Sequence, residues 1–177
     1  MAEHVKVLLS EEEVQARIKE LGEQISKDYA GEEEGVHLIS ILKGGVYITV
    51  DLAKRISVPV TMDFMSVSSY QGTTSTGAVK IIKDLDNSIE GKNVIIVEDI
   101  IDTGRTLSYL VEMLKGRNPK SIKICTLLDK PERRVTEVNV DYVGFRIPDE
   151  FVIGFGLDYN QRYRNYPYIG VIEFTED

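Results

Sequence analysis

The pattern of hydrophobic and polar residues along the chain predicts alternating strands and helices. Mostly apolar runs predict strands buried on both faces, as in a parallel sheet, at 36–42, 94–97 and 122–128. Apolar positions spaced three or four residues apart predict helices at 14–25, 46–56 and 107–114. Less uniform strand patterns occupy 58–64, 79–85, 140–147 and 168–173. This order is typical of an α/β fold in which a mostly parallel, twisted sheet is flanked by helices.

Local signals mark where some of these elements begin and end. Ser10-Glu-Glu-Glu13 has the form of a capping box, and Gly116-Arg-Asn-Pro119 is a helix-ending segment. Residues 66–77 are rich in small hydroxyl side chains and glycine, with few apolar anchors, which predicts a mobile loop. Because no internal repeat or long linker interrupts the chain, we expect residues 1–177 to form one domain.

Composition and charge narrow the class of protein. The 177 residues are 42% hydrophobic and 28% charged, as in ordinary soluble domains, and the net charge is −8. That charge argues against nucleic acid as the main partner. The single cysteine, Cys125, excludes an internal disulfide and a cysteine-cluster metal site. No apolar run has the length of a membrane span or a secretion signal, so we expect no membrane partner and a cytoplasmic location.

The segment Val94–Thr106 carries the strongest chemical signal. A buried strand is expected to end in Glu98 and Asp99, Asp102 follows, and Thr-Gly-Arg-Thr then opens a helix. Ligands of parallel sheets bind at the carboxyl ends of the strands, and a helix N-terminus offers N–H groups to a phosphate. Carboxylates beside an anion site require sugar hydroxyls or a bridging divalent cation. The motif therefore predicts a phosphorylated sugar together with magnesium.

Two other predicted strand ends carry unusual loops at the same edge of the sheet. Lys43-Gly44-Gly45 allows the backbone to approach an anion closely, although a plain tight turn explains a glycine pair more often than not. Lys130 follows the strand at 122–128, where an ordinary surface lysine is the simpler interpretation. Asp102 has its own alternative role, that of a helix cap.

These motifs together resemble those of a known family. Val97–Thr106 is similar to the phosphoribosyl-pyrophosphate motif of type I phosphoribosyltransferases, and its Glu-Asp-x-x-Asp-Thr-Gly form resembles the hypoxanthine-guanine branch. The similarity continues in order through Leu42–Gly45, Ser69–Tyr70, Leu128–Lys130, Asp141–Asp149, Phe151–Gly154, Leu157–Asn160 and Arg164. It covers nearly all of the chain beyond the middle of the first predicted helix. It implies a small hood, formed by the N- and C-terminal segments, above the sheet.

The resemblance also implies a reaction and its site. A 6-oxopurine base would displace pyrophosphate from phosphoribosyl pyrophosphate with Mg²⁺ as cofactor, and Asp102 would act as general acid or base at purine N7. Glu98, Asp99 and Asp158 would serve magnesium. The implied phosphoribosyl pyrophosphate contacts are Lys43, Gly44, Glu98, Asp99, Asp102, Thr103, Gly104, Arg105, Thr106 and Arg164.

The family resemblance assigns the base and the lid as well. Lys130 would donate to the exocyclic O6, Phe151 would stack on the base, and the Val152 backbone would read its opposite edge. Ser69 and Tyr70 would belong to a lid that excludes water. Glu150 stands where some relatives carry lysine, which leaves the preference among hypoxanthine, guanine and xanthine open. The family assembles as homodimers or homotetramers.

Two other functions remain to be weighed against this one. Pyrimidine-operon attenuation proteins share the size and the phosphate loop but bind RNA; they lack the acid that Asp102 supplies, and a net charge of −8 disfavours RNA. A phosphoribosyltransferase for adenine, orotate or uracil is the second alternative. Lys130 and the Phe151-Val152 pair argue against it.

Overall fold

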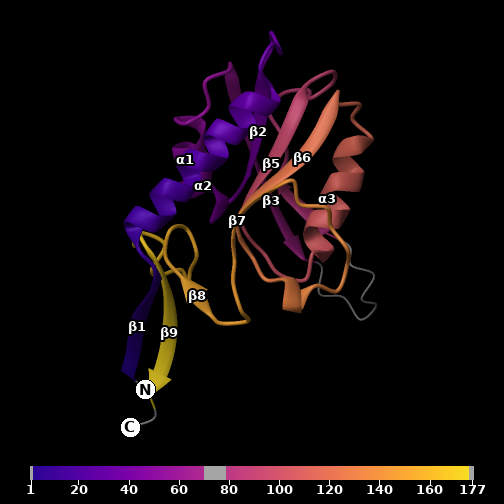
Figure 1. The fold of residues 1–177 in the computed structure, drawn as a ribbon. Helices are drawn as coiled ribbons and strands as arrows, with labels where there is room; N and C mark the ends of the chain where they lie inside the picture. The colour runs from indigo at the N-terminus through magenta and orange to yellow at the C-terminus, as the bar shows by residue number, and fades with distance from the viewer. Residues whose placement is uncertain (1, 70–78, 176–177) are drawn as a thin grey trace.

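The computed structural model of the protein describes residues 2–69 and 79–175 (Figure 1). It contains three α-helices and a short 3₁₀ turn, namely α1 (Glu11–Asp28), α2 (Gly45–Ala53), α3 (Arg105–Lys115) and η1 (Pro131–Arg133). Its strands are β1 (Ala2–Leu9), β2 (Val36–Ile41), β3 (Val60–Ser69), β4 (Val79–Lys83), β5 (Asn93–Ile101), β6 (Ser121–Asp129), β7 (Tyr142–Arg146), β8 (Val152–Ile153) and β9 (Ile169–Thr175). The predicted α/β class is confirmed.

The main sheet has six strands in the order β4-β3-β2-β5-β6-β7, and only β4 is antiparallel to its neighbour. The chain runs outward from β2 to β3 and then returns to place β5 on the other side of β2. The order of strands therefore reverses between β2 and β5. In open sheets of this kind, ligands bind at such a point, beyond the carboxyl ends of the strands.

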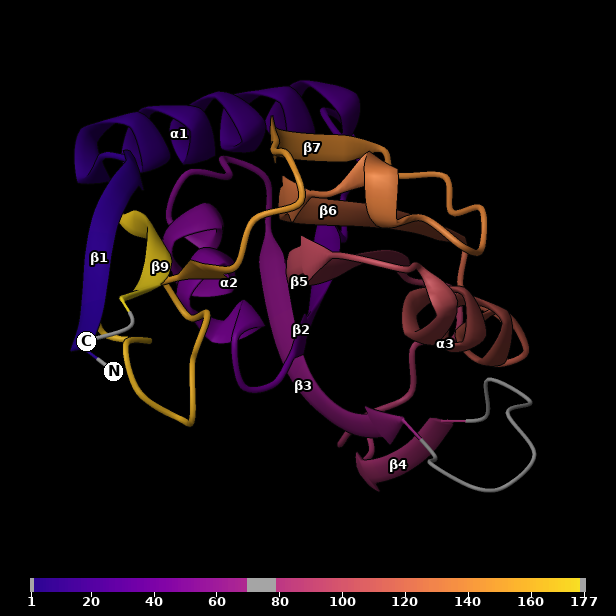
Figure 2. The same cartoon turned by 90° about the horizontal axis from the view of Figure 1, so that it is seen from below.

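Helices cover both faces of the main sheet, with α1 and α2 on one face and α3 on the other (Figure 2). The strand period of two sorts the apolar run of β5 between these layers. Ile95 and Val97 pack in the core formed with α1 and α2, whereas Val94 and Ile96 pack in the core formed with α3. Burial on both faces explains why this strand shows no polar alternation in the sequence.

The hood predicted from the family resemblance is a second, three-stranded sheet in the order β1-β9-β8. Strand β1 pairs antiparallel with β9, so the two ends of the chain lie side by side (Figure 1). Val152, Ile169 and nearby apolar residues of the hood belong to the same core cluster as α1 and α2. This shared core fixes the hood to the main sheet and to α1 and α2.

The structure corrects several boundaries. Helix α2 ends at Ala53 rather than residue 56, and residues 66–69, expected in an unanchored loop, extend β3 and pair with β4. Strand β5 does not end at its acids but continues to Ile101, and Glu98 and Asp99 face opposite sides of the strand. The rest of the predicted loop, including Tyr70, lies outside the described residues.

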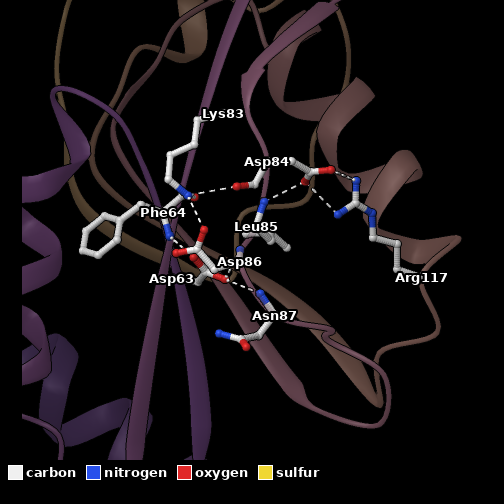
Figure 3. A network of polar contacts seen from close by, with 8 residues as sticks. All are labelled: Asp63, Phe64, Lys83, Asp84, Leu85, Asp86, Asn87 and Arg117. Atoms are coloured by element: carbon white, nitrogen blue, oxygen red, sulfur yellow. Dashed lines mark hydrogen bonds and ion pairs between the residues drawn. The ribbon is translucent and has the colours of Figure 1, made fainter.

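Asp63 of β3 anchors the turn that follows β4 (Figure 3). Its side chain is 2% exposed and accepts the backbone N–H groups of Phe64 at 2.8 Å, Asp86 at 2.9 Å and Asn87 at 3.2 Å. Burial alone would raise the pKa of Asp63, but these three donors outweigh it and hold that pKa below its ordinary value. A buried carboxylate therefore serves as the acceptor for a backbone turn.

The same network reaches across to the end of α3 (Figure 3). The Arg117 guanidinium donates to both carboxylate oxygens of Asp84, at 2.8 and 2.9 Å. The Lys83 ammonium donates to the carbonyl oxygens of Phe64 and Asp84 and to the Asp86 carboxylate. We call the Asp63, Lys83, Asp84 and Arg117 contacts the β4 network, which joins β3, β4 and α3 at the edge of the sheet.

Candidate functional site

Asp99 of β5 and the Lys43-Gly44-Gly45 loop meet at the point where the order of strands reverses. Gly44 follows β2 as the N-cap of α2, and a Cβ atom placed on Gly44 would overlap the carboxylate of Asp99 on β5. The carbonyl oxygen of Gly44 in turn lies against Gly156 of the loop between β8 and β9. The Leu42–Lys43 peptide bond is cis. The carboxyl ends of β2 and β5 and a hood loop thus form one continuous wall.

A smaller cavity of about 140 Å³ lies at the start of α3. It is lined by Glu98, Ile100, Ile101, Asp102, Thr103, Gly104, Thr106 and Leu107. Gly104 stands at the N-cap with φ 82°, and a Cβ there would lie 2.5 Å from the Thr136 carbonyl oxygen. Only glycine fits this turn, which aims the first turn of α3 at the cavity. Such a helix start is suited to a phosphate.

A larger cavity of about 610 Å³ adjoins it. Its lining consists of Asp99, Ile100, Asp102, Lys130, Arg133, Asp149, Phe151, Val152, Leu157 and Asp158. All three residues predicted to bind the base are among these. Phe151 is 52% exposed, and its ring meets Tyr159 edge-on with centroids 5.7 Å apart. Because Ile100 and Asp102 line both cavities, the two form one elongated site with an anion end and an aromatic end.

Two predicted cationic residues meet beside the larger cavity. The Lys43 ammonium and the Arg164 guanidinium donate to the same acceptor, the side-chain oxygen of Gln161, at 3.1 and 3.2 Å. Arg164 also pairs with Asp158 at 3.2 Å and donates to the Gly156 carbonyl at 2.6 Å. These contacts place both cations near Asp99, where a polyanionic group would find them.

Burial perturbs both acids of β5. It raises the pKa of Asp99 to about 6; backbone N–H groups and Arg164 oppose this shift, and the charge of Asp158 adds to it. Burial, followed by the charge of Asp99, raises the pKa of Glu98 well above its ordinary value. Two desolvated neighbouring carboxyls are costly to ionise without a compensating cation. Perturbation of this kind is typical of a functional site.

Asp102 is not a helix cap. The N-cap of α3 is Gly104, and no side chain donates or accepts a capping hydrogen bond there. The Asp102 carboxylate instead accepts a hydrogen bond from Arg133 Nε at 2.9 Å, and it faces both cavities. This removes the simplest structural alternative for the residue.

Comparison with known proteins agrees with this arrangement. A family model described as phosphoribosyl transferase domain matches residues 4–160. The chain belongs to the phosphoribosyltransferase family. It is 54% identical over 177 residues, or 99% of its length, to the whole of a hypoxanthine phosphoribosyltransferase from Buchnera aphidicola.

Two further relatives give the same result. The chain is 54% identical over 169 residues to the bifunctional protein TilS/HprT of Listeria monocytogenes, of which the match is 26%. A crystal structure of a hypoxanthine phosphoribosyltransferase from Staphylococcus aureus superposes with a TM-score of 0.90 and 53% identity, covering 95% of this chain and 91% of that one.

The acids in the site of this phosphoribosyltransferase fit a magnesium ion that the protein and the substrate would hold jointly. In the part of the chain that the structure describes, no three His, Cys, Asp or Glu side chains converge to hold a metal. Asp99 and Asp158 line the larger cavity, whereas Glu98 lines the smaller one. Magnesium is commonly bound through one or two carboxylates, with water and substrate phosphates completing the octahedron. The acids present match that mode.

The expectation for Arg105 remains a backbone contact, and some residues beside the cavities were not predicted. Arg105 is exposed at the start of α3, and its side chain does not line the smaller cavity, which leaves its backbone as the available contact. The structure describes Ser69 as the last residue of β3. Arg133, Asp149 and Gln161 were not singled out. The spacing of Lys130 and Arg133 around Pro131 was the available signal for Arg133.

Proposed function

We propose that the protein transfers the phosphoribosyl group of phosphoribosyl pyrophosphate to N9 of hypoxanthine or guanine. The products are IMP or GMP and pyrophosphate, in a purine-salvage reaction. The observation that carries this proposal is the pair of adjoining cavities, with a helix N-terminus at one end and Lys130 with an exposed aromatic ring at the other. Such a pair accommodates a sugar phosphate and a flat base on the two sides of Asp102.

The donor would lie along the wall formed by β2 and β5. Its 5-phosphate would occupy the smaller cavity, bound by backbone N–H groups of residues 103–106 and by the two threonine hydroxyls. Glu98 and Asp99 would face the ribose hydroxyls. Its pyrophosphate would contact Lys43, Gly44 and Arg164. Lys43 and Arg164 now donate to Gln161, and both can donate to phosphate oxygens in its place.

The base would lie in the larger cavity. Lys130 is 8% exposed and its ammonium lies 3.6 Å from Asp149, so the cation is held inside the cavity wall. From there it can donate to a purine O6 but finds no acceptor on the 6-amino group of adenine. Phe151 offers its ring to the base, and Val152 is fixed by the pairing of β8 with β9.

The chemical step would draw on charge already arranged in the site. As the C1–pyrophosphate bond breaks, positive charge develops on the ribose and negative charge on the leaving group. Asp99 and Glu98 stabilise the positive charge on the ribose, and Lys43 and Arg164 stabilise the negative charge on the leaving group. Asp102 exchanges a proton with purine N7. Bound magnesium would neutralise the pyrophosphate and the two desolvated acids at once.

The proposal is tested by incubating the protein with phosphoribosyl pyrophosphate, magnesium chloride and hypoxanthine and following IMP formation. Guanine, xanthine, adenine, uracil and orotate form the comparison panel, and an RNA-binding assay at physiological salt tests the regulatory alternative. Nucleotide from hypoxanthine or guanine is the expected result. Absence of product from every 6-oxopurine would overturn the assignment.

Replacing Lys130 with methionine tests the base assignment within the active enzyme. We expect the ratio of kcat/KM for hypoxanthine over adenine to fall by about tenfold or more, because one buried donor is lost. The KM for phosphoribosyl pyrophosphate should change by less than about threefold. Equal loss in both parameters would contradict the role given to Lys130.

We also propose that residues 1–177 form a single domain that acts in the cytoplasm as a homodimer or homotetramer. The hood and the α1–α2 face share one core cluster, which supports the single domain. No described helix is long and apolar enough to cross a membrane. Burial raises the pKa of the Cys125 thiol to about 12, which fits a core residue. Tyr47 and Val50 leave an apolar face of α2 exposed, as a subunit contact requires.

A further inference from the structure

The short turn η1 holds Arg133 over the larger cavity beside Lys130. Pro131 opens the turn immediately after Lys130, and the Arg133 N–H donates to the Lys130 carbonyl oxygen at 3.1 Å. Lys130 is the N-cap of this turn and lies outside its helical residues, so this hydrogen bond is what ties Arg133 to Lys130. Both line the larger cavity. The turn therefore delivers a second cation at a fixed distance from the one that is expected to read the base.

Four charged groups form a chain across this cavity. Arg133 Nε donates to Asp102 Oδ1 at 2.9 Å, and Arg133 Nη1 lies 3.8 Å from Asp149 Oδ2. Asp149 Oδ1 in turn lies 3.6 Å from the Lys130 ammonium. The order is Asp102, Arg133, Asp149, Lys130, so Asp149 is the partner of both cations. Asp102 and Lys130 are therefore linked through Arg133 and Asp149.

We propose that Arg133 is a positioning residue that orients Asp102 for proton exchange with the base. This inference rests on the proposed function and adds a residue to it. Arg133 engages Oδ1 of Asp102, while the other carboxylate oxygen remains available to the purine. A base that is itself oriented by a third group is the general arrangement of activated catalytic pairs. Because a guanidinium stays charged throughout the accessible pH range, Arg133 is a permanent cationic partner for the Asp102 carboxylate.

Asp149 completes this arrangement by holding Arg133. The guanidinium and the Asp102 carboxylate are each about half exposed, at 48% and 46%, so their ion pair alone is weak. A second acid on the other side restricts the arginine to one position between two carboxylates. The contact with Asp149 also links the position of Arg133 to that of Lys130. Proton exchange and recognition of O6 are thereby fixed relative to each other.

The test compares four enzymes in steady-state kinetics with hypoxanthine: wild type, Arg133→Gln, Asp102→Asn and the double variant. Arg133→Gln should lower kcat by about tenfold, part of the hundredfold or more that general acid–base catalysis supplies. Its KM for phosphoribosyl pyrophosphate should stay within about twofold. Asp102→Asn should lower kcat further while donor binding persists. In the Asp102→Asn background, removal of Arg133 should have no further effect beyond about twofold, because its target is already lost.

Matched controls separate positioning from general effects. Arg146→Gln removes one arginine from an exposed site on β7 that lines neither cavity, and it should leave kcat unchanged. Arg133→Lys restores the charge without the guanidinium fork and should recover part of the lost rate. Equal melting temperatures for the single variants would exclude unfolding as the cause.

Each outcome bears on one claim. A wild-type rate in Arg133→Gln, or rate losses that multiply in the double variant, would overturn the positioning role while leaving the proposed function intact. Absence of IMP formation by the wild type would overturn the proposed function and the positioning role together. A rise in donor KM with unchanged kcat would assign Arg133 to donor binding instead and overturn the inference.

Discussion

At the scale of single residues, the contact between Gly44 and Asp99 sets the geometry of the proposed donor site. The Asp99 carboxylate takes the space that any side chain on residue 44 would need, so glycine lets the loop after β2 lie against the acid of β5. The close contact also contributes to the desolvation that raises the pKa of Asp99 to about 6. An acid in this state is held at a cost in stability that a bound cation can offset.

Replacing Asp99 with asparagine should stabilise the ligand-free protein. An ordinary aspartate ionises near pH 4, whereas Asp99 does so near 6 in the folded state, so folding favours its protonated form. The wild type therefore loses stability as the pH rises from about 4 to above 6, and the variant should lose less. At pH 7.5 we expect a gain of about 1–2 kcal/mol in the free energy of unfolding, measured by urea titration.

The same substitution should remove stabilisation by the donor. Phosphoribosyl pyrophosphate with magnesium should raise the melting temperature of the wild type at pH 7.5, because a ligand that binds only the folded state stabilises it. In Asp99→Asn this rise should shrink markedly. An undiminished rise would mean that Asp99 does not take part in binding the donor.

At the scale of elements, the β4 network determines how the antiparallel edge strand is attached. Strand β4 has a half-exposed pattern and, among the described residues, pairs only with β3, so little apolar burial holds it. The backbone donors gathered by Asp63 and the forked Arg117–Asp84 pair supply the remaining attachment. These charged side chains hold β4 and the turn after it in place.

Replacing Asp63 with asparagine should destabilise the protein by about 2 kcal/mol at pH 7, because buried N–H groups would face an amide. The pKa of Asp63 is lowered by folding, so its contribution is present above about pH 4 and is lost as the pH falls further. The variant should therefore show a smaller loss of stability on acidification. Urea titrations between pH 3 and 7 measure both effects.

Asp86→Asn provides the control for this prediction. Asp86 pairs with Lys83 through a carboxylate that is 72% exposed, and such surface pairs contribute on the order of 0.5 kcal/mol. Equal losses in the two variants would show that burial of the Asp63 carboxylate does not matter.

The elements best predicted from sequence are those buried on both faces. Strands β2, β5 and β6 and helix α3 carry long apolar runs or clear helical spacing, which local sequence alone expresses. The sequence did not predict β1 because its pairing partner, β9, is far away along the chain. It did not predict β8 because that strand has only two residues. The extension of β5 beyond its acids was not predicted because tertiary hydrogen bonds to β6, rather than side-chain polarity, continue the strand.

The residues of the candidate site also divide into those that the sequence predicts and those that it does not. Residues in dense motifs, such as Asp102 and Lys130, were identified from sequence. Arg133, Asp149 and Gln161 were not, because their role depends on loops that approach one another only in the fold. Apart from the spacing of Lys130 and Arg133 around Pro131, these loop residues carry no local signal that distinguishes a partner in the site from a solvated side chain.

At the scale of the whole molecule, an exposed apolar face predicts self-association. Val50 on α2 is 42% exposed, next to the partly exposed Tyr47. Val50→Glu would place a charge in any subunit contact made by this face, and an unpaired buried charge is strongly unfavourable. We expect light scattering after gel filtration to show a lower molecular mass than the wild type. Lys19→Gln, an equal change in charge on the exposed side of α1, should not alter the mass.

The shared wall of Ile100 and Asp102 between the two cavities has a consequence for inhibitor design. A compound that joins an anionic head to a flat heterocycle must carry its linker across these two residues, and the rigid strand β5 sets the length of that linker. A linker bearing a cationic nitrogen at the crossing would meet Asp102 directly. Compounds with neutral linkers of equal length would forgo that contact and should bind more weakly.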